Sequence, residues 1–163
     1  MNSYNLIIIG GGAGAFAAAI EANRRGAKTA MINAGLPVGG TCVNVGCVPS
    51  KKLLWAGEVL HTAKSHGIDG LEIDVKALNF AKIVAEERAL VEKMRKDKYE
   101  SLLANLENVT YIESKARFVS PNEVEVKGKA IKGDTFVIAT GSTARVPDIA
   151  GIHNVGYLTH IEA

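Results

Sequence analysis

LIIIGGGAGAFAAAIEANRR, the stretch from Leu6 to Arg25, decides the fold of this chain. The short apolar run at its start is typical of a strand buried on both faces of a parallel sheet. The alanine-rich run after the glycines predicts a helix, and Gly26 supplies the residue that ends it. Because a second apolar strand follows at Thr29–Asn33, we expect a right-handed strand–helix–strand unit.

The glycine turn inside this unit fits the pattern G-x-G-x-x-G/A, with Gly10, Gly12 and Ala15 at its key positions. The first glycine permits a tight turn, the second lets the backbone approach a pyrophosphate, and the small third residue lets helix and strand pack closely. A helix N-terminus at this point would offer unpaired N–H groups to phosphates. The pattern therefore favours dinucleotide binding over a plain glycine-rich turn.

One position departs from that pattern. The second strand of a dinucleotide-binding unit usually ends in an Asp or Glu that binds ribose hydroxyls, whereas here it ends in Asn33. An amide oxygen accepts a hydrogen bond but carries no charge, so we expect weaker binding of the adenosine. The alternative is that Asn33 only begins a turn ahead of Gly35, a role that suits asparagine.

The segment GGTCVNVGCVPSK, residues 39–51, contains both cysteines of the chain. If Cys42 and Cys47 lay on one regular helix, the rise alone would separate their Cα atoms by about 7.5 Å. A disulfide tolerates no more than roughly 7 Å. A bridge between them therefore requires a bend in the chain, which Gly46 can supply.

Three interpretations of the cysteine pair remain open: a redox-active disulfide, a structural bridge, and a metal site or unpaired thiols. Lys51 follows Cys47 by four residues and so shares its helix face, and a cation and a helix N-terminus both stabilise a thiolate. A bent, glycine-containing bridge is more easily reduced than a relaxed one. The spacing favours the redox interpretation.

The rest of the chain alternates between helices and strands. We expect a helix over residues 50–65, a break at 67–74, and a long helix over 76–106. From Val109 the apolar period changes to two, which predicts short antiparallel strands at 111–119, 122–128 and 129–133. A buried strand at Asp134–Ala139 then ends in a Thr-Gly-Ser turn. The expected fold class is α/β, with a small antiparallel meander.

The composition is that of an ordinary globular protein. The chain has 163 residues, of which 47% are hydrophobic and 22% charged, and its net charge is +2. Acidic and basic residues are interspersed, so we expect neither a nucleic-acid partner nor a membrane surface. The N-terminal residues lack the features of a signal peptide, from which we expect a cytoplasmic protein.

The combination of GGGAGA, GGTCVNVGCVPSK and FVIATGS resembles the flavin-dependent pyridine nucleotide–disulfide oxidoreductases. The resemblance extends over the whole chain, and its cysteine motif is highly specific. It implies a Rossmann-like FAD-binding domain with FAD as cofactor and NADPH or NADH as co-substrate. Cys47 would be the thiol facing the flavin, and Cys42 the interchange thiol that meets the substrate.

The same resemblance assigns cofactor contacts residue by residue. The glycine turn would cradle the FAD pyrophosphate, the end of the second strand would lie near the adenosine ribose, and Lys51 would lie near the reactive nitrogen of the flavin. The implied cofactor-binding residues are Gly10, Gly12, Gly14, Ala15, Asn33, Gly35, Gly40, Thr41, Lys51, Ala116, Thr140, Gly141 and Ser142.

Within that family the chain is most similar to the mercuric reductases, through Ala15, the segment KYESLL and the segment KARFVSPNEVEV. This implies that electrons pass from NADPH through FAD and the cysteine pair to Hg(II), held transiently by Cys42 and Cys47 and released as Hg(0). The alternatives are a dihydrolipoamide dehydrogenase or related disulfide reductase, and a non-catalytic FAD- or nucleotide-binding fragment.

Family members are roughly three times as long as this chain. We therefore expect residues 1–163 to be the N-terminal part of an incomplete FAD-binding domain. The NAD(P)H-binding domain and the dimerisation domain would lie outside it. The full-length enzyme is expected to be a homodimer, and the fragment alone to be inactive.

Overall fold

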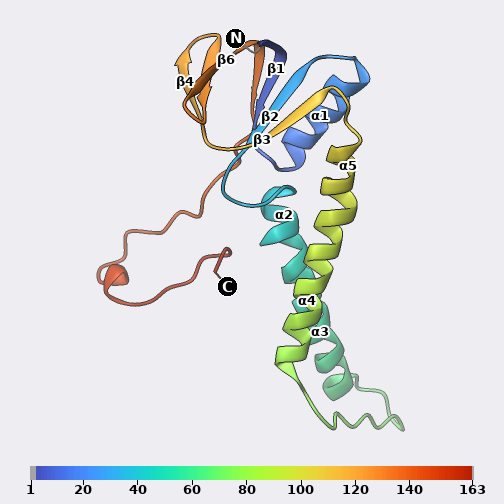
Figure 1. Ribbon diagram of the computed structural model, residues 1–163. Helices are drawn as coiled ribbons and strands as arrows, with labels where there is room; N and C mark the ends of the chain where they lie inside the picture. The colour runs from blue at the N-terminus through green and yellow to red at the C-terminus, as the bar shows by residue number, and fades with distance from the viewer. Residues whose placement is uncertain (1–2, 163) are drawn as a thin grey trace.

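A computed structural model describes residues 3–162 and contains one six-stranded sheet in the order β3-β2-β1-β6-β5-β4 (Figure 1). Strands β1, β2, β3 and β6 run parallel, whereas β4 and β5 form an antiparallel edge. The strands are β1 (Ser3–Ile9), β2 (Thr29–Asn33), β3 (Val109–Glu113), β4 (Ala116–Ser120), β5 (Glu123–Val126) and β6 (Lys129–Ile138). The predicted α/β fold with an antiparallel meander is confirmed.

The strand–helix–strand unit forms as predicted. Helix α1 (Ala13–Arg24) connects β1 to β2, which pair in parallel from Leu6 with Thr29 onward. Gly26 follows the helix with φ 70°, the left-handed conformation that its missing side chain permits. The predicted stop of the helix is therefore confirmed.

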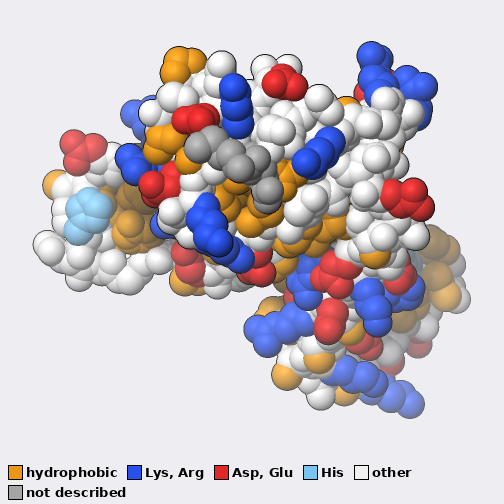
Figure 2. Space-filling model, turned by 45° about the horizontal axis from the view of Figure 1, so that its top comes forward, with side chains coloured by type: hydrophobic (Ala, Val, Ile, Leu, Met, Phe, Trp, Pro, Cys, Tyr) orange, Lys and Arg blue, Asp and Glu red, His pale blue; other side chains and the backbone are white. Residues whose placement is uncertain are grey.

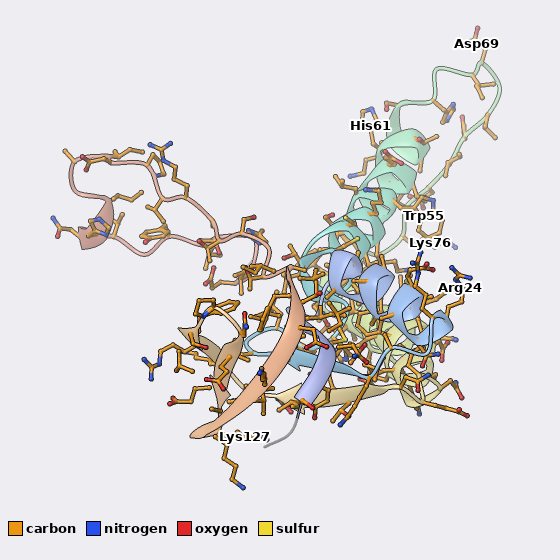
Figure 3. The ribbon with its side chains drawn as sticks, turned by 90° about the horizontal axis from the view of Figure 1, so that it is seen from above. Arg24, Trp55, His61, Asp69, Lys76 and Lys127 are labelled. Carbon is orange, nitrogen blue, oxygen red and sulfur yellow. The ribbon has the colours of Figure 1, made fainter. Side chains whose placement is uncertain are left out.

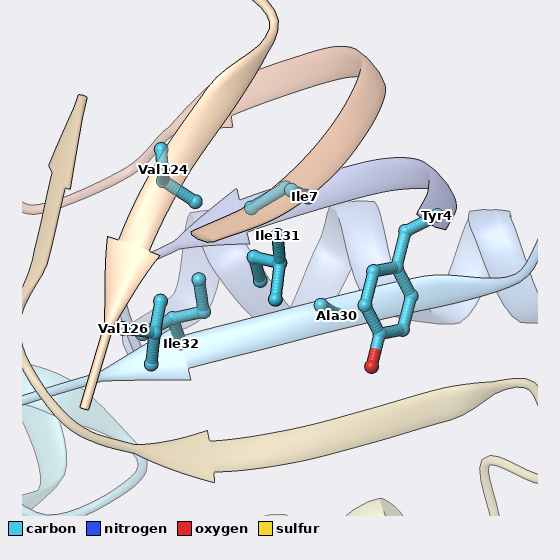
Figure 4. Packing of buried hydrophobic residues seen from close by; sticks show 7 residues of the cluster. All are labelled: Tyr4, Ile7, Ala30, Ile32, Val124, Val126 and Ile131. Atoms are coloured by element: carbon cyan, nitrogen blue, oxygen red, sulfur yellow. The ribbon is translucent and has the colours of Figure 1, made fainter. Parts of the chain in front are cut away.

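Both faces of β1 and β2 are covered by apolar side chains. The segment 134–139 was predicted to be a buried strand, but its residues are half-buried or exposed, and Ile138 is 69% exposed. One cluster lies between β1, β2 and the antiparallel meander, and Figure 4 shows its members: Tyr4, Ile7, Ala30, Ile32, Val124, Val126 and Ile131. The other cluster lies under α1, where Phe16 and Ala19 pack on Ile8 and Met31. Burial on both faces is the reason why these strands read as continuous apolar runs.

Three of the predicted strands differ from the structure because strand partners depend on distant parts of the chain. The predicted antiparallel strand over 111–119 is two strands, of which β3 pairs in parallel with β2, Thr29 opposite Val109. The segments 129–133 and 134–139, predicted as separate, form the single strand β6. The first residues of β6, up to Lys132, pair with β5, and those from Lys132 onward pair with β1, so that the meander continues into the parallel sheet.

Between β2 and β3 the chain forms a helical hairpin that projects from the sheet. It contains α2 (Gly40–Asn44), α3 (Cys47–Ser65), α4 (Phe80–Arg95), the π-helical turn η1 (Lys96–Glu100) and α5 (Ser101–Ala104). Figure 3 shows Trp55 and His61 along α3, with Asp69 at the far end of the hairpin. Helix α2 was not predicted.

The helix bounds differ from the predicted ones for local reasons. Helix α3 begins at Cys47 rather than at residue 50, and Pro49 is tolerated in its first turn. Helix α4 begins at Phe80 rather than at 76, because the side chain of Asn79 accepts a hydrogen bond from the Lys82 N–H and caps the helix. The long helix ends at Ala104 rather than at 106.

After β6 the chain leaves the sheet as an extended segment that carries the short 3-10 helix η2 (Ile152–Asn154) (Figure 1). On the face shown in Figure 2, Lys and Arg side chains are mixed with Asp and Glu. None of the helices in residues 3–162 combines the length and the apolar character needed to cross a membrane.

Candidate functional site

The candidate site begins at the glycine turn between β1 and α1. Gly10 has φ 133°, and a Cβ added to it would lie 2.1 Å from the backbone oxygen of Ala139 at the end of β6. The Gly10 N–H donates to the oxygen of Ile32 at 2.8 Å. Only glycine fits here, because the turn passes between the ends of two strands without room for a side chain.

A second glycine pair, Gly39–Gly40, lies directly against the first turn. The Gly39 N–H donates to the oxygen of Gly11 at 2.8 Å. Gly40 has φ 62°, and a Cβ on it would lie 2.8 Å from the Cα of Gly12. The two loops thus touch backbone to backbone, which brings the segment with the cysteines to the start of α1.

The two glycine loops border a cleft of about 430 Å³ at the carboxyl ends of β1, β2 and β6. The chain leaves β1 toward β2 on one side, while β6 flanks β1 on the other, and such a switch point is where open α/β sheets bind ligands. Nine of the predicted cofactor-binding residues line the cleft: Gly10, Gly12, Asn33, Gly40, Thr41, Ala116, Thr140, Gly141 and Ser142.

The other predicted contacts lie around this cleft rather than along it. Gly14 is in the first turn of α1, and Ala15 is fully buried against the sheet, where it lets the helix approach closely. Gly35 lines a neighbouring hollow of about 550 Å³ together with Glu100 and Tyr111. Lys51 lies in the first turns of α3.

The cleft fits a dinucleotide on grounds of its own geometry. Helix α1 points its N-terminus toward the turn, and its first turn contains no acidic residue. Its unpaired N–H groups and positive dipole end suit a pyrophosphate. Gly10, Gly12 and Gly40 line the cleft with backbone alone, because their missing side chains let the two loops pack against each other and against the end of β6.

Asn33 ends β2 at the wall of the cleft, and its side chain is already engaged. Its Nδ2 donates to the oxygen of Leu36 at 3.0 Å and lies 3.4 Å from the hydroxyl of Tyr111. A Cβ on Gly11 would lie 2.5 Å from its Oδ1. Asn33 thus both orders the following turn and lines the cleft, so the two roles foreseen for it are compatible. The sequence did not indicate that Gly11 lines the cleft or that Tyr111 contacts Asn33.

The cysteines lie on two helices separated by a sharp break. Cys42 is in α2, which ends at Asn44, and Cys47 is the first residue of α3. A Cβ on Gly46, between the two helices, would lie 2.9 Å from the oxygen of Thr41. The predicted bend at Gly46 is confirmed. Both cysteines are exposed free thiols in the structure, so the disulfide itself stays a prediction.

The two thiols interact, and the interaction changes the pKa of Cys42. The pKa of the Cys42 thiol is raised, first by its side-chain hydrogen bond with Cys47, then by partial burial and by the charge of Cys47. The ammonium of Lys51 acts in the opposite direction on the same pKa. Lys51 is therefore close enough for its charge to act on the thiol of Cys42. That it shares a helix face with Cys47, as its spacing indicates, stays a prediction.

This pKa shift has a measurable consequence. Because Cys47 is the first cause of the raised pKa of Cys42, we expect Cys47→Ala to move the pH profile for alkylation of Cys42 to lower pH. Rates of iodoacetamide labelling, followed by peptide mass spectrometry, measure this. Ser65→Ala, at the far end of α3, is the control and should leave the profile in place. A profile unmoved by Cys47→Ala would contradict the assignment.

A permanent metal centre finds no support in the part of the chain that the structure describes. Within residues 3–162, no three His, Cys, Asp or Glu side chains gather into a group that could hold an ion. The cysteine pair offers two sulfur ligands, which suit a soft ion in transit.

Comparisons with known proteins agree with this arrangement. Mercuric reductase of Lysinibacillus sphaericus is 42% identical over 158 residues, which are 97% of this chain and 29% of that protein. Mercuric reductase of Bacillus cereus is 46% identical over 156 residues, or 96% of this chain and 24% of that protein. The chain thus spans under a third of the length of these curated relatives.

Solved structures give the same picture. The flavoprotein disulfide reductase RclA of Escherichia coli, induced by HOCl, aligns with a TM-score of 0.71 at 28% identity, covering 92% of this chain and 31% of that one. Its Cu(II) complex aligns with a TM-score of 0.73. The model of the pyridine nucleotide-disulphide oxidoreductase family matches residues 4–163. With this family match over nearly its whole length and a cysteine pair that directly follows the glycine loop of the cleft, this chain belongs to the pyridine nucleotide-disulphide oxidoreductases.

Proposed function

We propose that the full-length protein is an FAD-dependent oxidoreductase that passes electrons from NADPH, through FAD and Cys42–Cys47, to Hg(II). The observation that carries the proposal is a pair of interacting, exposed thiols that follows directly on the glycine loop of the cleft. The identity of 42 to 46% with mercuric reductases supports Hg(II) as the substrate. Residues 1–163 would form the N-terminal part of the FAD-binding domain.

The cleft at the ends of β1, β2 and β6 is the proposed cofactor site. The turn at Gly10–Gly12 and the N-terminus of α1 would hold the pyrophosphate, and Asn33 and Ala116 would lie at the adenosine end. Gly141 and its neighbours, at the end of β6, would close the opposite wall. When bound there, FAD supplies the transfer of electrons between the nicotinamide and the cysteine pair.

The protein's own part lies in the two sulfurs and their surroundings. Cys47, at the N-terminus of α3, would stand as the flavin-side thiol, and Cys42 would exchange with the substrate. As thiolates the pair would bind Hg(II), and two electrons delivered to the ion would give Hg(0). Lys51, whose charge lowers the pKa of Cys42, would stabilise the negative charge that this chemistry requires.

A second candidate is a disulfide reductase, such as a dihydrolipoamide dehydrogenase. The observation that favours it is the likeness to RclA, a flavoprotein disulfide reductase, at 28% identity. In that case Cys42 would attack a disulfide of the substrate, and the pair would close as the substrate is reduced to two thiols.

Substrate competition distinguishes the two candidates. We expect the full-length protein to oxidise NADPH faster with HgCl₂ in excess thiol than with lipoamide or oxidised glutathione. Faster turnover with either disulfide would overturn the Hg(II) assignment.

We further propose that the full-length protein is a homodimer located in the cytoplasm. Light scattering would test the oligomeric state, and cell fractionation would test the location.

A further inference from the structure

The long helix of the hairpin contacts the cysteine segment through its π-helical turn. At η1 (Lys96–Glu100) the backbone leaves the α-helical spacing, and such turns often accompany functional sites. Tyr99 of this turn packs edge-on against Phe16, with ring centroids 4.9 Å apart, and lies over Gly39. Arg95, just before the turn, reaches Asn44. The turn and the residue before it therefore contact Gly39, which precedes the helix α2 of the first cysteine, and Asn44, the last residue of α2.

Asn44 lies between the two cysteines and makes contacts on both sides of its amide. Its Nδ2 lies 2.8 Å from the oxygen of Gly40, 3.1 Å from that of Pro37 and 3.2 Å from that of Val38. Its Oδ1 accepts a hydrogen bond of 3.2 Å from Nη1 of Arg95. Donors and acceptors match in this orientation only, since the opposite one would set oxygen against three carbonyls.

These contacts close the chain around Cys42. The three carbonyls precede Cys42 and Asn44 follows it, so the amide ties together the two ends of the segment that carries this thiol. Cys47 is fixed separately, at the start of α3, where the Ser50 hydroxyl donates to the oxygen of Gly46 at 2.6 Å. The Asn44 contacts therefore position Cys42 but not Cys47, and they affect the distance between the two sulfurs through Cys42 alone.

We propose that Asn44 is a positioning residue for the redox pair and that Arg95 holds Asn44 in place. This rests on the proposed function, because it assumes that Cys42 and Cys47 form a disulfide. Holding Cys42 beside Cys47 raises the effective concentration of one thiol at the other. The amide thereby stabilises the closed, oxidised form relative to the dithiol.

Equilibration of the full-length protein with glutathione buffers tests this proposal. Each pair of thiols that closes loses two protons and two electrons, and one oxidised glutathione becomes two reduced ones. Quenching by alkylation and mass spectrometry of the peptide with both cysteines gives the oxidised fraction. We expect Asn44→Ala to lower the equilibrium constant for closure about tenfold, which raises the midpoint potential by about 30 mV.

Three further variants separate the contacts. Asn44→Asp keeps the acceptor for Arg95 but sets a carboxylate against three carbonyls, so its shift should equal or exceed that of alanine. Arg95→Leu should give a shift of about threefold, or about 14 mV, in the same direction. Asn105→Ala is the matched control, because its Nδ2 donates to the Ser101 oxygen at 2.7 Å and reaches no part of the cysteine loop. It should leave the potential unchanged.

The outcomes tell this inference apart from the proposed function. If wild-type protein never forms the Cys42–Cys47 disulfide, the proposed function fails and the inference with it. If the wild type closes and the Asn44 variants keep its potential, only the inference is overturned. Thermal unfolding shows whether Asn44→Ala folds. If it does not, the other two variants decide: an unchanged potential in Arg95→Leu overturns the role of Arg95, and an unchanged potential in Asn44→Asp overturns the role of Asn44.

Discussion

Replacing Cys47 with serine in the full-length protein should reduce NADPH-dependent turnover on the order of 10³-fold or more, because no disulfide can then form. Cys47 begins α3 and interacts with the Cys42 thiol. The sequence contains two cysteines, so no third thiol of this chain can replace it. A hydroxyl keeps the size of the side chain but has no accessible redox chemistry. Steady-state NADPH oxidation with HgCl₂ measures the effect.

The partner variant Cys42→Ser supplies the comparison. It should be equally inactive, but it retains the thiol assigned to the flavin side, so only this variant should show the long-wavelength absorption of a thiolate beside the flavin. Bound flavin in both variants would show that the cleft is intact. Turnover of Cys47→Ser within tenfold of wild type would contradict a role for the pair.

Replacing Gly10 with alanine should destabilise the domain by about 3 kcal/mol or more and abolish flavin binding. The new Cβ would lie 2.1 Å from the Ala139 oxygen, a contact with backbone that no side-chain rotation relieves, and φ is 133°. Either β6 must move away from β1 or the turn must open, and both changes disrupt the cleft. Urea unfolding and retention of flavin after gel filtration measure the two effects.

Replacing two other glycines with alanine distinguishes the effect of the clash at Gly10 from the effect of its positive φ. Gly26 has φ 70° with nothing within 4 Å of an added Cβ, so Gly26→Ala should cost only about 1 to 2 kcal/mol and keep the flavin. Gly57 lies inside α3 with open space around it, so Gly57→Ala should raise the free energy of unfolding by up to about 1 kcal/mol. If Gly10→Ala were no worse than Gly26→Ala, the close packing of the turn against β6 would be wrong.

Local sequence signals predicted the parts of the fold that local physics determines. The glycine turn, the strands on either side of α1, the stop at Gly26 and the break at Gly46 follow from backbone preferences of a few residues. The same signals predict where most of the cleft lies, because the glycine turn at the end of one strand and the Thr-Gly-Ser turn after another strand meet at one edge of the sheet.

Non-local partners explain what the sequence did not predict. Whether Val109–Glu113 pairs in parallel with β2 or antiparallel with the meander depends on a strand some 80 residues away, and both choices share a period of two. The contacts of Asn33 with Tyr111 and of Asn44 with Arg95 likewise join distant segments. Asn33 and Asn44 each lie close to glycines in the sequence, a setting typical of turns, so nothing in their neighbours indicated these partners.

The central claim, that Cys42 and Cys47 form a disulfide that NADPH opens, is tested most directly by counting their thiols. One sample of the full-length protein would be alkylated under anaerobic conditions before NADPH is added, and a second sample, with a different alkylating reagent, after one equivalent of NADPH. Mass spectrometry of the peptide that contains both cysteines then gives the state of the pair in each sample. We predict a bridged peptide before NADPH and two alkylated cysteines after it. Two alkylated cysteines before NADPH, or a bridge that persists after it, would contradict the account.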